Sequence, residues 1–136
     1  MTVLLVDAAN VVGSRPDGWW RDRAGATSRL LDRLARLVGR PLTGPEGTSL
    51  QVAEVVAVVE GRARDVPAPD GVRAVRASGS GDDALVECAR HLVTEGRPLL
   101  VVTADRGLRD RLPSGTRAAG AGWLLSRLDE RDTDPA

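Results

Sequence analysis

Four acidic side chains lie at comparable places in the sequence, each where a predicted strand ends or a predicted helix begins. Asp7 follows the apolar residues 3–6, Glu60 follows the apolar residues 55–59 at the end of a predicted strand over residues 50–59, and Asp105 follows soon after the apolar residues 99–102. Asp82 lies at the start of a predicted helix. Carboxylates gathered at one edge repel each other unless a cation lies among them, and hard oxygen ligands suit Mg²⁺ or Mn²⁺. Such metals activate water and stabilise the leaving oxygen in phosphodiester hydrolysis, which is the chemistry this pattern indicates.

Each acid also has an ordinary structural explanation. A lone acid after a strand, such as Asp7, often caps a turn, and Glu60 can simply be solvated. Asp83 fits a capping box at the start of its helix, where an acid also suits the helix dipole. The capping box leaves Asp82 unexplained. We therefore expect Asp7, Asp82 and Asp105 as the main metal ligands, with Glu60 or Asp83 assisting.

Three polar residues beside the acids are candidates for a supporting role. Asn10 could orient the Asp7 carboxylate or bind a phosphate, or it could form an Asx turn after the strand. Arg106, next to Asp105, could hold a phosphate and stabilise charge in the transition state, or it could form a surface ion pair. Thr103 could bond a metal-bound water or be an ordinary strand-end residue. We predict Asn10 and Arg106 as catalytic residues together with the three aspartates.

The predicted loop over residues 11–23 contains a cluster of aromatic and basic side chains. Such clusters stack bases and hold the backbone of single-stranded nucleic acid. The alternative is that at least one of the two tryptophans in this loop covers the first helix. The candidate substrate-binding residues, from this loop and from the loop after the second long strand, are Arg15, Trp19, Trp20, Arg21, Arg23, Arg62 and Arg64.

Length and composition indicate an ordinary globular domain. The chain has 136 residues, 42% of them apolar and 28% charged, and its formal net charge is zero. We expect one domain over residues 1–128, followed by a polar, disordered tail over residues 129–136. The single cysteine excludes an intrachain disulfide. Since no signal peptide or membrane-length apolar run is recognised, a cytoplasmic location without membrane contact is expected.

The apolar runs predict an α/β fold. Strands are expected at residues 3–6, 50–59, 72–77, 98–103 and 116–119, with helical segments at residues 30–38, 84–95, 106–112 and 123–128. Two of the runs have no polar face, which is typical of strands in a parallel sheet covered on both sides. Alternating strands and helices favour a parallel sheet with right-handed crossovers. We predict the strand order 3-2-1-4-5, which makes the first and fourth strands neighbours at the topological switch point.

Three short segments resemble the signature regions of PIN-like nucleases, specifically their NYN branch. They are Val-Asp-Ala-Ala-Asn over residues 6–10, Gly-Ser-Gly-Asp-Asp-Ala-Leu over residues 79–85, and Val-Val-Thr-Ala-Asp-Arg-Gly over residues 101–107. Each motif is short, and it is their order, spacing and placement at strand ends that carry the resemblance. The resemblance implies a three-layer α/β/α sandwich with a mainly parallel sheet, and metal-dependent cleavage of RNA.

The same resemblance assigns roles to individual positions. It places the first acid at Asp7, the helix-start acid at Asp82 and the late acid at Asp105, and Glu60 falls near an acid seen after the second strand in some relatives. One departure is Gly107, where many members of the family carry a further aspartate. The missing aspartate would belong to a second metal site, so the resemblance supports the first metal site more strongly than the second.

Two functions are consistent with this pattern. The first is a ribonuclease that uses Mg²⁺ or Mn²⁺ on single-stranded or structured RNA. The second is a catalytically impaired PIN-like module that binds RNA or protein, which Gly107 and the neutral net charge favour. A receiver-like phosphoryl-transfer domain would need a lysine near the acids, and the chain has none. A homodimer is compatible with either function.

Overall fold

One mixed sheet forms the middle layer of the protein. The computed structural model describes residues 1–132. The strands are β1 (Thr2–Asp7), β2 (Pro41–Thr43), β3 (Ser49–Val59), β4 (Val72–Arg76), β5 (Leu99–Val102) and β6 (Arg117–Ala119). Their order in the sheet is β2-β3-β1-β5-β6, and β4 also pairs with β3.

The long strand β1 lies at the centre of this sheet. It pairs in parallel with β3 on one side and with β5 on the other, so that Leu4 lies opposite both Val55 and Leu100. The outer strands β4 and β6 add in parallel to β3 and β5. Along the five parallel strands the order is therefore β4-β3-β1-β5-β6, which confirms the predicted 3-2-1-4-5 arrangement and its switch point between β1 and β5.

The antiparallel strand β2 was not predicted. Its three residues pair with Ser49–Gln51 at the start of β3, across the loop that the sequence indicates over residues 43–48. The strand begins with Pro41, which lacks an N–H and is tolerated at a sheet edge. The proline and the short length conceal the strand in the sequence, and the contact of Leu42 with the core cluster is what holds it in place.

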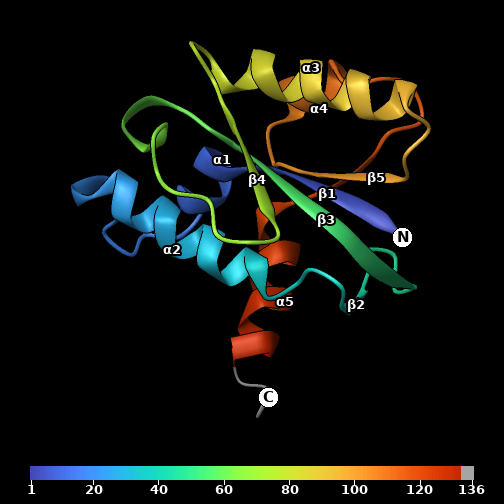
Figure 1. Ribbon diagram of the computed structural model, residues 1–136, viewed down its shortest axis with the longest axis horizontal. Helices are drawn as coiled ribbons and strands as arrows, with labels where there is room; N and C mark the ends of the chain where they lie inside the picture. Colours follow the sequence, from blue (N-terminus) through green and yellow to red (C-terminus); the bar gives the residue numbers. More distant parts are fainter. Residues whose placement is uncertain (133–136) are drawn as a thin grey trace.

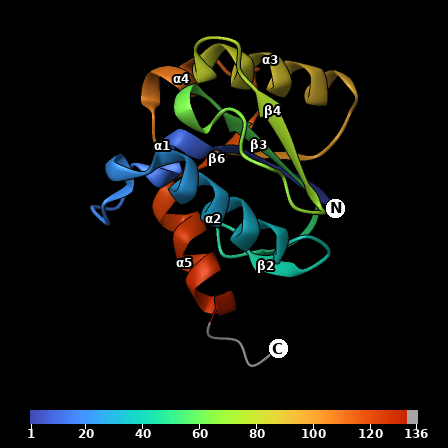
Figure 2. The same ribbon diagram turned by 60° about the vertical axis from the view of Figure 1, so that its left-hand side comes forward.

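Helices cover both faces of the sheet, as Figures 1 and 2 show. One face carries α1 (Ala8–Val12), α2 (Arg23–Ala35) and α5 (Ala121–Asp132), and the other carries α3 (Gly81–Thr94) and α4 (Arg106–Asp110). Two short 3₁₀ turns, η1 (Trp19–Arg21) and η2 (Gly61–Ala63), lie in the connections. The result is the three-layer α/β/α sandwich that the sequence predicts. Within residues 1–132, every helix is too short or too polar to span a bilayer.

Both faces of β1 are buried, and its residues alternate between two cores. Leu4 and Val6 pack in the core under α1, α2 and α5, whereas Val3 and Leu5 pack in the core under α3 and α4. None of these four side chains is more than 1% exposed. This period-two alternation between two apolar layers explains why the sequence shows an unbroken apolar run rather than a polar and an apolar face.

The last helix is longer than predicted. We expected a disordered tail over residues 129–136, but α5 continues to Asp132, so the part of that expectation covering residues 129–132 is wrong. Asp129 of this helix accepts hydrogen bonds from Arg15 and Arg33, each at 2.8 Å. These ion pairs give the polar end of the helix partners that the sequence alone does not reveal. Residues 133–136 lie outside the described residues.

Candidate active site

The carboxyl edge of the parallel strands brings the predicted acids to one side of the molecule. Asp7 is the last residue of β1, Glu60 directly follows β3, and Asp105 lies at the N-terminus of α4 after β5. Asp82 is the second residue of α3. Because these strands run in the same direction, their ends and the helix starts share one edge, which is where open α/β sheets bind ligands.

Asp7 is the most buried of these acids, with 9% of its surface exposed. Its Oδ2 accepts a hydrogen bond from Thr103 Oγ1 at 3.0 Å, and its Oδ1 accepts one from the Asn10 backbone N–H at 3.4 Å. Burial raises the pKa of Asp7, the hydrogen bonds from Thr103 and Asn10 oppose this rise, and the negative charges of Asp82 and Glu60 add to it. The Asp7 carboxylate therefore lies within electrostatic reach of two further acids.

Thr103 connects Asp7 to the segment that carries Asp105. Its side chain is fully buried, and the same hydroxyl oxygen that donates to Asp7 accepts a hydrogen bond from the Asp105 backbone N–H at 3.2 Å. Asp105 in turn caps α4, since its Oδ1 accepts from the Leu108 N–H at 3.1 Å. Thr103 therefore links Asp7 to Asp105, which we predicted to lie close together. For Thr103 itself the sequence offered two alternatives, a bond to a metal-bound water or an ordinary place at a strand end.

Asn10 holds two parts of the site together. Its backbone N–H donates to Asp7 Oδ1 as the N-cap bond of α1, while its side-chain Oδ1 accepts a hydrogen bond from the Ala104 N–H at 3.0 Å and so forms no Asx turn. One residue of α1 therefore fixes both the carboxylate at the end of β1 and the backbone after β5. This arrangement orients Asp7, which was one of the two roles considered for Asn10.

Glu60 joins the end of β3 to the start of α3. Its Oε2 accepts a short hydrogen bond from the Gly81 N–H, so one oxygen of this candidate ligand satisfies a free helix N–H. A Cβ atom at position 81 would lie 2.5 Å from the same oxygen. Only glycine permits this approach, which explains the residue before the pair of acids. The start of α3 is also capped by Ser80, whose Oγ accepts from the Asp82 N–H at 3.2 Å.

The remaining charged candidates are more exposed. Asp83 forms an ion pair with Arg111 at 2.6 Å, and 73% of its side chain is accessible to solvent. Arg106 is the first residue of α4 and is exposed, and its guanidinium has no ion-pair partner among residues 1–132. Arg106 therefore remains available for an anionic ligand, whereas Asp83 already has a cationic partner.

The donor set at this edge suits a hard divalent cation. Across residues 1–132, no group of three or more His, Cys, Asp or Glu side chains is placed closely enough to hold a metal ion. Mg²⁺ does not require such a group, because it commonly binds through one or two carboxylates and keeps several waters. Asp7 and Asp82 offer carboxylate oxygens, and a cation between them would oppose both the burial that mainly raises the pKa of Asp7 and the repulsion from Asp82 that adds to it. The residues present therefore fit Mg²⁺ or Mn²⁺.

Most of the predicted aromatic and basic residues gather beside this acidic edge. The Arg23 guanidinium lies 5.3 Å from the centre of the Trp19 ring, and Trp20 meets Trp19 edge-on with ring centres 6.0 Å apart. Trp19, Arg23 and Arg62 line a cavity of about 330 Å³ that Glu60 also borders. An adjoining hollow is lined by Trp20, Arg21, Arg23 and Arg62.

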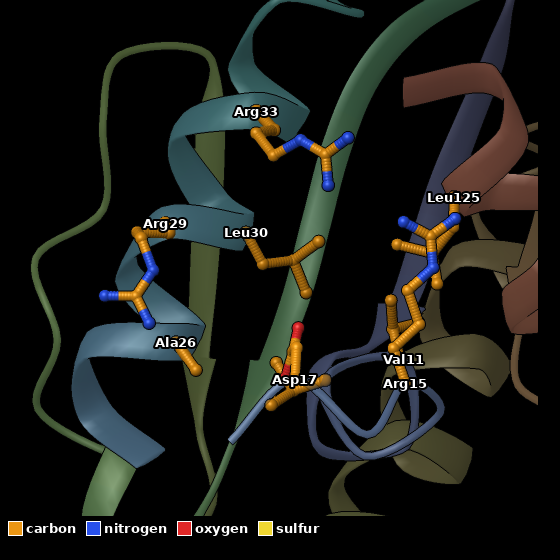
Figure 3. Close-up of a pocket in the computed structure, with 9 residues that line it drawn as sticks. Val11, Arg15, Asp17, Ala26, Arg29, Leu30, Arg33 and Leu125 are labelled. Atoms are coloured by element: carbon orange, nitrogen blue, oxygen red, sulfur yellow. The ribbon is translucent and has the colours of Figure 1, made fainter. Parts of the chain in front are cut away.

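Arg15 and Arg64 lie elsewhere. Arg15 borders a groove between α1, α2 and α5, a cavity of about 320 Å³ shown in Figure 3, and its guanidinium pairs with Asp129 at 2.8 Å. That carboxylate raises the pKa of Arg15. Arg64 follows η2, is exposed, and borders neither cavity beside the acids. The structure thus separates these two arginines from the other substrate-binding candidates.

Comparison with known proteins places the fold. The sequence matches no protein-family model and no curated protein sequence. Among solved structures, it is similar to Rae1 (YacP) from Bacillus subtilis, with a TM-score of 0.71 and 18% identity, covering 97% of this chain and 76% of that one. A tryptophan-to-leucine variant of Rae1 gives a TM-score of 0.67 and 20% identity, covering 97% and 77%. At this identity the likeness establishes a shared fold alone: the chain has the α/β/α architecture found in Rae1.

Proposed function

We propose that the protein is a ribonuclease that hydrolyses RNA phosphodiester bonds with Mg²⁺ or Mn²⁺ held at the acidic edge. The observation that supports this most directly is the environment of Asp7. Its carboxylate is buried at the switch point of the sheet, fixed by Thr103 and Asn10, and exposed to the charges of Asp82 and Glu60. Asp7 also caps α1 by accepting the Asn10 N–H, but a cap does not require burial beside other acids, and carboxylates perturbed in this way cluster at functional sites.

The roles of the individual residues follow from their placement. Asp7 and Asp82 would hold the ion, and Asp105 would act on it through a coordinated water. When bound, a divalent ion lowers the pKa of a coordinated water and stabilises the leaving oxygen. Arg106, exposed at the start of α4, is placed to bind the substrate phosphate and to offset its growing negative charge.

The sequence motifs and the fold support the same proposal independently. The three segments that resemble PIN-like nucleases contribute Asp7, Asp82 and Asp105, and the fold brings all three to one edge. The three arginines and two tryptophans of the neighbouring cavities would meet an RNA strand that approaches that edge. This arrangement is the one a nuclease of single strands requires.

A PIN-like module that binds RNA without cleaving it is the second candidate. Two observations favour it: the absence of a three-acid cluster within residues 1–132, and Gly107 in place of the further aspartate. A Cβ at position 107 would lie 3.4 Å from Asp105 Oδ1, so an aspartate there would add its charge directly beside Asp105. This chain lacks that charge.

Cleavage of a single-stranded RNA by the purified protein distinguishes the two candidates. We expect cleavage with Mg²⁺ or Mn²⁺, no cleavage in EDTA, and a loss of at least about 100-fold in rate for Asp7→Asn and Asp105→Asn, which corresponds to about 3 kcal/mol of transition-state stabilisation. The matched control is Asp110→Asn, an exposed carboxylate at the end of α4, which should keep full activity. If neither ion supports cleavage, or if Asp7→Asn cleaves as fast as the unmodified protein, the nuclease proposal fails.

A further inference from the structure

The cavity beside Glu60 has the size and the wall chemistry of a binding pocket for one small planar group. Its volume is about 330 Å³, within the range of small-ligand pockets. Small residues of α1 and of the η2 turn form part of its lining, and Trp19, Arg23, Arg62 and Thr27 contribute the larger side chains. Glu60 borders it on the side of the acidic edge.

One wall of this cavity is flat and cationic. The Arg23 guanidinium lies over the Trp19 ring, 5.3 Å from its centre, and the edge-on Trp20 ring supports Trp19 at an interplanar angle of 86°. The ring and the guanidinium thus support each other before any ligand arrives. Aromatic rings and guanidinium planes are the surfaces on which proteins stack unpaired bases.

A second observation points to a ligand in the same cavity. Thr27 of α2 lines it and is only 3% exposed, and no side-chain hydrogen bond ties its hydroxyl to another residue in the range 1–132. The hydroxyl oxygen is not among the fully buried atoms that lack a partner in this range, so it is accessible from the open cavity, where a ligand can bond it. Glu60 uses one carboxylate oxygen for the Gly81 N–H, and its other oxygen can accept a further hydrogen bond.

We propose that this cavity binds one unpaired nucleobase of a single-stranded RNA. The base stacks on the Trp19–Arg23 wall, and its polar edge bonds Thr27 and Glu60. Arg23 and Arg62 border both this cavity and the open hollow at Trp20, so they take the phosphate between the bound base and its neighbour. The inference rests on the proposed function, since it assigns to that site the strand whose phosphate reaches the acidic edge.

Binding to a defined sugar-phosphate chain, measured in EDTA so that nothing is cleaved, tests the inference. The probe is a dye-labelled chain of five units that carries one adenine on its central unit, and the reference is the same chain without any base. Fluorescence anisotropy gives both affinities. The variants are Trp19→Leu and Thr27→Val, of which the second keeps the side-chain shape and removes only the hydroxyl. Arg90→Gln, an exposed charge removal on α3, is the control.

We expect the adenine to strengthen binding about tenfold in the unmodified protein and in Arg90→Gln. Trp19→Leu should abolish most of this gain, and Thr27→Val should reduce it about threefold while the melting temperature shows the variant folded. Equal affinity for the two chains, or a gain that survives in both variants, would overturn the inference. Base-dependent binding in EDTA, combined with no cleavage in the separate assay with Mg²⁺ or Mn²⁺, would refute the nuclease proposal alone. Cleavage in that assay without base-dependent binding in EDTA would refute this inference alone.

Discussion

The hydroxyl of Thr103 holds the two halves of the acidic edge in place. It donates to Asp7 at the end of β1 and accepts from the backbone of Asp105, residues that are 98 positions apart in the sequence. Since Thr103 is fully buried, neither bond can be replaced by bulk water. A threonine at a strand end is an ordinary sequence feature, and only the adjacency of β1 and β5 gives it this function.

Thr103→Val should destabilise the protein by about 1–3 kcal/mol, because the same-shaped side chain leaves the Asp7 carboxylate and the Asp105 N–H without their partner. Urea unfolding in EDTA measures this loss. The control is Thr94→Val, whose hydroxyl bonds the Arg90 carbonyl on the exposed face of α3 and whose removal should cost less than about 0.5 kcal/mol. Equal losses in the two variants would show that Thr103 has no special role.

Asp7→Asn should stabilise the protein near neutral pH while abolishing activity. Burial raises the pKa of Asp7, so folding favours its protonated form, and the stability of the unmodified protein falls as the pH rises above the ordinary carboxyl value of 3.8. Asparagine carries no charge to bury. Melting temperatures measured in EDTA should therefore be higher for the variant at neutral pH, and this advantage should shrink as the pH falls toward 3.8 and be absent below it. An advantage independent of pH would refute the assignment to Asp7 ionisation.

At the scale of elements, the contact between Glu60 and Gly81 fastens the end of β3 to the start of α3. Gly81→Ala would place a Cβ 2.5 Å from the Glu60 carboxylate, so we expect a loss of about 1–3 kcal/mol in urea unfolding. Gly122→Ala is the matched control, because position 122 lies inside α5 with no atom within 4 Å of the new Cβ. There alanine should stabilise the helix by about 0.5–1 kcal/mol. A neutral Gly81→Ala would mean that the carboxylate moves freely.

The turn η1 presents one tryptophan to solvent. Trp20 is 52% exposed and borders the hollow that adjoins the proposed base pocket. Trp20→Ala should weaken binding of a single-stranded RNA in EDTA by about 5- to 100-fold, the usual contribution of a stacked base. Its melting temperature should stay close to that of the unmodified protein, since little surface is buried by the side chain. Unchanged RNA affinity would exclude Trp20 from the binding surface.

The central strands were predictable because three of the five parallel ones end in a clear sequence signal. The apolar runs before Asp7, Glu60 and Asp105 set both the strands and the acids at their ends. The short β2 and the last turn of α5 were missed, since a proline and a run of charges conceal them until partners such as Leu50 and Arg33 are in place.

The site was predictable to the same depth. An acid that directly follows an apolar strand can be assigned to the site from the sequence, because the carboxyl ends of parallel strands lie at one edge of the sheet. Thr27 was not identified, since its position in α2 resembles that of a core residue and only packing against η2 makes it line a cavity. Arg15 was placed with the substrate-binding residues because of its loop, but the chain turns after α1 and directs it toward Asp129.

For the molecule as a whole, the net charge is zero, so any attraction for RNA must come from the local distribution of charge. Arg21, Arg23 and Arg62 border the two hollows beside the acids. We expect the logarithm of RNA affinity to fall with the logarithm of salt concentration with a slope of about −2, near −0.7 for each phosphate contacted. Neutralising the three arginines together should flatten this slope.

Arg15→Gln is the control for the salt experiment, because Arg15 borders the groove between α1, α2 and α5 and pairs with Asp129. For Arg15→Gln, the RNA affinity and its dependence on salt concentration should equal those of the unmodified protein. Both are measured by fluorescence anisotropy titration in EDTA. A decrease as large as that caused by Arg62→Gln would extend the RNA path to the opposite side of α1.

The central place of β1 affects how the protein forms during synthesis. Its two neighbours come from distant parts of the chain: β3 begins at residue 49 and β5 at residue 99. While a ribosome is still making the second half, one long edge of the most apolar strand lacks its partner, and unpaired edges invite association with other chains. The hydrogen bond from Thr103 to Asp7 also forms only after β5 has emerged. A partly synthesised chain therefore cannot assemble the acidic edge until residues 99–105 have been translated.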